Sequence, residues 1–150
     1  MKKIFSGLIA MITLFSLFSC AYLFGGENDA NKEINTITDF SKYANMTRET
    51  DKIEVTFDNY TGKPFCFTIE DKQDIDEIMN IVFSASFVNR GNELFAGDNT
   101  SITIIQGDAK YTLGVNGSRE GKNFYAFSTQ ELHGKIRELA RKAGAYYAVE

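Results

Sequence analysis

The stretch IEVTFDNYTGKPFCFTI, residues 53–69, decides the fold of this 150-residue chain. Ile53, Val55 and Phe57 alternate with polar residues, and a similar alternation returns over residues 65–69. A period of two is typical of a strand that buries only one face. The residues between the two runs favour a turn, because they include Asp, Asn and Gly. We therefore expect an antiparallel β-hairpin here.

Two amphipathic helices are predicted C-terminal to this hairpin. Asp71 is placed to cap the first helix, whose apolar residues fall at helical spacing. These residues are Ile75, Ile78, Met79, Val82 and Phe83. The second helix is predicted to begin with a capping box formed by Ser128 and Glu131. Its apolar stripe comprises Leu132, Ile136, Leu139, Ala140 and Ala143. Gly144 is placed to end this helix in a left-handed cap.

Three further strands are expected between the helices. They cover residues 102–105, 111–115 and 124–127. Residues 84–100 are expected to be an irregular connection, and residues 116–121 a loop that starts with an Asn-Gly turn. The resulting order, β-β-α-β-β-β-α, predicts the α+β class, with an antiparallel sheet of about five strands and both helices on one face.

The domain is expected to comprise residues 51–150, which is long enough for one small core. Residues 20–50 are largely polar and indicate a tether that holds the domain away from a membrane. Four apolar residues within this tether lie three positions apart and predict a short helix that docks on the domain. They are Ile34, Ile37, Phe40 and Tyr43.

The N-terminus indicates export from the cytoplasm. Two lysines precede an uncharged run, residues 4–19, as in a secretory signal peptide. The run closes on Leu17-Phe18-Ser19-Cys20, which resembles a bacterial lipobox at every position except Phe18. The resemblance implies that residues 1–19 are removed and that Cys20 is acylated. The chain would then be a bacterial lipoprotein, anchored to a membrane of the cell envelope through the lipid on Cys20.

Two alternatives to lipidation remain open. The uncharged run continues through residue 24, giving about 21 residues, enough to span a bilayer as an uncleaved helix. The two lysines would then stay on the cytoplasmic side. Ordinary cleavage of the signal peptide would instead release a soluble protein. All three alternatives place the domain outside the cytoplasm.

Few residues offer the chemistry of a familiar active site. His133 is the one histidine of the chain, which excludes paired imidazoles and His-based metal clusters. We expect it on a solvated helix flank in line with Arg137 and Arg141; the alternative is a cationic stripe against anionic lipid. Cys66 is expected to pack as a small apolar side chain. A disulfide between Cys20 and Cys66 is the alternative if Cys20 is not acylated.

A group of acidic residues falls at the start of the first predicted helix. These residues are Glu70, Asp71, Asp74, Asp76 and Glu77. They lack the spacing and central glycine of an EF-hand, and carboxylates at a helix N-terminus complement its dipole. We therefore interpret them as helix-capping residues and predict neither a metal site nor a cofactor.

The net charge and the composition of the chain narrow the range of functions that we expect. The net charge is −4, and removal of residues 1–19, which hold two lysines and no acid, makes it −6. An acidic chain repels phosphate backbones, so nucleic acid binding is not expected. The predicted outer sheet face has the composition of a solvated surface: Glu54, Thr56, Thr68, Thr103 and Thr112. We expect a non-catalytic module that binds a protein or small ligand; the alternative is an extracytoplasmic hydrolase that uses dispersed carboxylates.

Overall fold

The computed structural model describes residues 32–60, 62–92 and 99–145. Within these residues the chain forms two 3₁₀ helices, seven strands and two α-helices. In chain order they are η2 (Ile37–Asp39), η3 (Ser41–Tyr43), β1 (Lys52–Phe57), β2 (Phe65–Ile69), α2 (Lys72–Ser84), β3 (Phe87–Asn89), β4 (Ser101–Gln106), β5 (Ala109–Gly114), β6 (Gly117–Glu120), β7 (Asn123–Phe127) and α3 (Glu131–Lys142). The predicted α+β class is confirmed.

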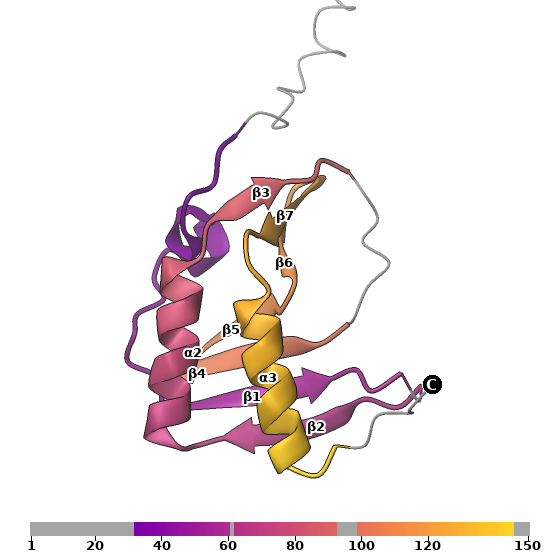
Figure 1. Cartoon of the computed structure of the whole chain (residues 1–150). Helices are drawn as coiled ribbons and strands as arrows, with labels where there is room; N and C mark the ends of the chain where they lie inside the picture. Colours follow the sequence, from indigo (N-terminus) through magenta and orange to yellow (C-terminus); the bar gives the residue numbers. More distant parts are fainter. Residues whose placement is uncertain (1–31, 61, 93–98, 146–150) are drawn as a thin grey trace, which may run out of the picture.

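All seven strands belong to one antiparallel sheet, in the order β2-β1-β4-β5-β6-β7-β3. The predicted hairpin is the β1–β2 pair, in which Val55 lies opposite Phe67. Both helices lie on the same side of the sheet and contact each other (Figure 1). The expectation of about five strands was too low, because it missed β3 and β6.

Neither of the two missed strands has a local sequence pattern that identifies it as a strand. β3 has only three residues, too few for an alternating pattern to be recognised. β6 reads Gly-Ser-Arg-Glu, a composition typical of a turn, yet it pairs with β7 along its whole length. Residues 84–100 are therefore not wholly irregular, and the predicted loop of residues 116–121 contains a strand.

A pair of glycines joins strands β2, β1, β4 and β5 to strands β6, β7 and β3. β5 and β6 pair only where Gly114 lies opposite Gly117. Gly117 has a φ of +147°, and a Cβ atom there would lie 2.2 Å from the carbonyl oxygen of Tyr125. Only glycine at position 117 allows β6 to approach β7 so closely. Beyond this pair the sheet turns, so that β6, β7 and β3 lie above the other four strands in Figure 1.

The core lies between the sheet and the two helices. β1 contributes Ile53, Val55 and Phe57, which are buried as the alternation predicted. The helices contribute the predicted stripes, with all but Phe83 and Ala143 of those side chains buried. Among the described residues, no buried side-chain nitrogen or oxygen atom lacks a hydrogen-bond partner. On β1, β2, β4 and β5 most side chains of the opposite sheet face are exposed or partly exposed, with Ile105 an exception.

The segment before β1 is part of the core. Ile34, Ile37, Phe40 and Tyr43 are each at most 2% exposed. The Phe40 ring packs edge-on against Phe87, with centroids 5.0 Å apart, and Ile34 forms a single β-bridge with Phe87. A spacing of three residues matches one turn of a 3₁₀ helix, which explains why η2 and η3 formed here. The predicted docking is confirmed, so the core begins N-terminal to residue 51.

Three features of the helix ends were predicted, and two of them are confirmed. The Asp71 carboxylate accepts a hydrogen bond from the Asp74 amide at 3.0 Å and caps α2. Gly144, at a φ of +93°, ends α3 in a Schellman motif, in which the Ala145 amide donates to Ala140. The predicted capping box of α3 was wrong. Ser128 instead accepts a hydrogen bond from the Ser86 hydroxyl at 2.7 Å, next to the β3–β7 pair.

The membrane expectations concern residues 1–31 and lie outside the described residues. Within residues 32–60, 62–92 and 99–145, no helix is long and apolar enough to cross a bilayer.

Candidate functional site

The sheet face opposite the helices carries a set of polar side chains that the strand register brings together. We call it the open face and define it by side chains of β1, β2, β4 and β5. They are Glu54, Thr56, Cys66, Thr68, Ser101, Thr103 and Thr112. Thr56, Cys66, Thr68 and Thr112 are exposed and the other three are partly exposed. The solvated face predicted from alternation is thus present.

The side chains of the open face form rows across the strands. Thr68, Glu54, Thr103 and Thr112 lie side by side, because each is the register partner of the next. The hydroxyl oxygens of Thr103 and Thr112 are 3.0 Å apart and share a hydrogen bond. Each hydroxyl donates one hydrogen bond and accepts two, so the row retains capacity for a polar ligand. This arrangement suits recognition through hydrogen bonds.

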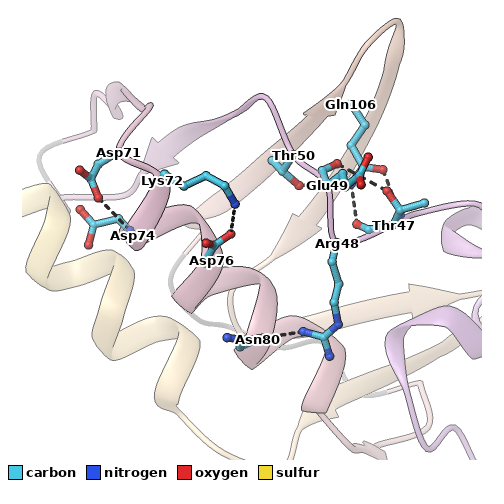
Figure 2. Close-up of polar contacts among 10 residues, drawn as sticks. All are labelled: Thr47, Arg48, Glu49, Thr50, Asp71, Lys72, Asp74, Asp76, Asn80 and Gln106. Atoms are coloured by element: carbon cyan, nitrogen blue, oxygen red, sulfur yellow. Dashed lines mark hydrogen bonds and ion pairs between the residues drawn. The ribbon is translucent and has the colours of Figure 1, made fainter.

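A second polar region lies where residues 47–51 enter β1 (Figure 2). The side-chain amide of Gln106 accepts a hydrogen bond from the Thr47 amide at 3.1 Å and donates to the Thr47 carbonyl oxygen. The same amide donates to the Thr50 hydroxyl at 3.2 Å. The Asp51 carboxylate accepts a hydrogen bond from the Gly107 amide at 2.6 Å. These contacts fix the path of the chain into β1.

A hollow of about 550 Å³ lies between this segment and the start of α2. It is lined by Thr47, Glu49, Thr50, Asp51, Lys72, Gln106 and Gly107. Most of the polar groups around it already have partners in the fold; Lys72, for example, pairs with Asp76 one turn along α2 (Figure 2). We therefore assign these contacts to the architecture of the domain.

The acidic residues of α2 serve the helix and its packing. Asp74 and Glu77 both contact the ammonium group of Lys135 on α3, with Asp74 Oδ1 at 2.8 Å. The Lys135 side chain is only 9% exposed, and its hydrogen bonds to the two carboxylates raise its pKa. No group of three or more His, Cys, Asp or Glu side chains suited to a metal ion occurs in the described residues. The interpretation of Asp71 as a helix cap is confirmed.

Backbone and ion-pair contacts lower the pKa of three carboxyl groups. Amides of Thr36 and Asn35 donate to Asp39, and those of Tyr60 and Asn99 donate to Asp58. Lys142 lowers the pKa of Glu138 by hydrogen bonding and charge. A lowered pKa keeps a carboxylate ionised at neutral pH, whereas a general acid needs a raised one. The contacts of these three groups stabilise turns and a helix.

The described candidate site residues lie on different elements. Cys66 is exposed on β2, so the expectation that it packs as an apolar side chain was wrong. The reason is its even position in the strand, which turns the thiol away from the neighbouring phenylalanines and the core. His133 is partly exposed on α3, with Arg137 and Arg141 exposed on the same helix. Cys20, the predicted lipidation site, lies outside the described residues.

The sequence reasoning did not find Gln106 or Lys135. Both are polar residues whose roles come from contacts distant in sequence, with Thr47 and Asp74 respectively. No local pattern around either residue indicates such a role.

No known protein family, no curated protein and no solved structure matches this chain.

Proposed function

We propose that the protein is a membrane-tethered, extracytoplasmic lipoprotein whose domain is a non-catalytic interaction module. In this proposal the open face binds a protein or a small polar ligand. The observation that carries it is the one-sided packing of the sheet. Both helices cover one face (Figure 1), while the other presents rows of hydroxyl groups. A filled core with a broad polar sheet face suits binding, and binding needs no cofactor.

The acidic groups give the hydrolase alternative no support. The carboxylates for which contacts are described above act in caps, turns and ion pairs. A hydrolase of this kind needs two carboxylates that face a common concave site, with one pKa raised. We therefore do not extend the proposal to catalysis.

Substitutions that introduce charge test the binding role of the open face. Thr103→Arg combined with Thr112→Arg places two long cations in the hydroxyl row. Gln73→Arg combined with Ser84→Arg places the same charge on exposed positions of α2 and is the matched control. Full-length chains carrying either pair serve as baits on solubilised cell envelopes. We expect a partner that is captured by the wild type and the control and is lost with the first pair. Capture that is equal for all three baits would contradict the proposal.

The tether is tested separately. The proposal places a lipid on Cys20, supported by the match of Leu17, Ser19 and Cys20 to a lipobox. Cys20→Ser should leave an unprocessed chain of higher mass, or release the protein from the detergent-extracted membrane fraction. An unchanged mass and unchanged partitioning would exclude lipidation and favour the spanning anchor.

A further inference from the structure

The two ends of the sheet differ in how they are covered. β3 is the terminal strand at one end, and Ile34 pairs with its outer side through the Phe87 amide, which donates to Ile34 at 3.2 Å. β2 is the terminal strand at the other end, and its only strand partner among the described residues is β1. A terminal strand with an open edge offers a row of amides and carbonyls for pairing.

The composition of β2 favours such pairing. Edge strands are usually protected by charged residues, proline or a bulge. β2 reads Phe-Cys-Phe-Thr-Ile and contains no charge, proline or glycine. Phe65 and Phe67 are only partly buried, and their ring centroids lie 5.8 Å apart at the rim of the core. A strand added beside β2 would cover the exposed parts of both rings.

The charges at the two ends of β2 indicate which strand fits. Lys63 precedes the strand, and Glu70 and Asp71 follow it; all three are exposed. In antiparallel pairing of two copies, the basic end of each β2 lies beside the acidic end of the other. Parallel pairing would bring like charges together. A two-fold axis through the centre of the strand makes the contact self-complementary.

We propose that a second copy of this chain pairs with the first through antiparallel contact of their β2 strands, which makes one continuous sheet. The open faces of the two copies then lie on the same side of this sheet, since directly paired residues in antiparallel strands share a face. The contact area of a five-residue edge is small, so the dimer is a weak, concentration-dependent one. This inference is independent of the ligand of the open face.

Lysines on the edge test the inference. Cys66 and Thr68 are exposed, so Cys66→Lys combined with Thr68→Lys changes the edge without disturbing the core. Thr56→Lys combined with Thr112→Lys adds the same charge to β1 and β5 and is the matched control. The mass of each full-length chain is measured by sedimentation in density-matched detergent. We expect the wild type and the control to approach twice the mass of one chain as concentration rises, and the β2 variant to remain at the single mass.

Two results would overturn the inference: a wild-type chain that stays monomeric at every concentration, and a dimer that survives the β2 lysines. In the first case, dimerisation of a chain shortened after Ala145 would assign the edge to the chain's own C-terminal residues. Hydrogen exchange provides a second measurement, because backbone amides in a paired edge exchange more slowly. Amides of β2 should gain protection with concentration while those of β3 do not; equal behaviour would count against the pairing.

Discussion

Gly117→Ala should destabilise the domain strongly. The new methyl group would lie 2.2 Å from the Tyr125 carbonyl oxygen, against the 3.4 Å at which ordinary contact begins. The neighbouring atoms are backbone atoms of β7, which cannot rotate away. Separating β6 from β7 by about 1 Å at Gly117 costs roughly 1–3 kcal/mol by analogy with overpacked cores. The positive φ, in a region that almost only glycine adopts, adds about 1–3 kcal/mol.

The expected loss is therefore about 2–6 kcal/mol of the free energy of unfolding, a large part of the ~5–15 kcal/mol typical of a domain. Two other glycines provide graded controls. Gly121, in the β6–β7 turn, has a φ of +57° and open space around it, so Gly121→Ala should cost only about 1–2 kcal/mol. Gly134, within α3, also has open space, and Gly134→Ala should stabilise by about 1 kcal/mol.

Urea unfolding monitored by circular dichroism measures all three variants against the wild type. The reasoning requires the order Gly134→Ala, wild type, Gly121→Ala and Gly117→Ala, from most to least stable. If Gly117→Ala lost no more stability than Gly121→Ala, the close contact between Gly117 and β7 would be refuted.

Three further predictions concern the helices and the N-terminal segment. Asp71→Ala should cost about 1 kcal/mol in urea unfolding, because the α2 cap is lost; no loss would contradict the capping contact. The raised pKa of Lys135 means that its ion pairs stabilise the fold fully below the ordinary lysine value of 10.5 and progressively less above it. The stability of the wild type should therefore fall between neutral pH and about pH 11 by more than that of Lys135→Met, and parallel profiles would exclude this role. Phe40→Ala should cost about 3–5 kcal/mol, because the ring is fully buried; a loss below about 1 kcal/mol would show that the segment does not dock.

Strictly periodic segments allowed the correct predictions. The alternation of Ile53, Val55 and Phe57 placed β1, and the stripe from Ile75 to Val82 placed α2, because each buries one face against a single neighbour. The spacing of Ile34 and its three companions predicted a docked helix for the same reason. Such patterns are local and therefore readable in a sequence.

The errors arose where a distant segment decided the local structure. β6 is a strand because β7 pairs with it, although Gly117-Ser118 alone favours a turn. Ser128 has the sequence of a helix cap, but Ser86 continues the β3–β7 pairing and holds it there. The open face was predictable from alternation, whereas the terminal place of β2 in the sheet required the strand order, which no local pattern specifies.

The docking of Ile34 beside β3 determines how the domain would bear mechanical force. A pull through an N-terminal anchor would act first on the Lys32–Glu120 ion pair and the Ile34 bridge, and then on Ile37, Phe40 and Tyr43. The contacts of this segment with β3, β5 and β6 would have to break one after another as it opened. The strands that carry the hydroxyl row lie toward the other end of the sheet, and they would keep their structure while the N-terminal segment unravelled.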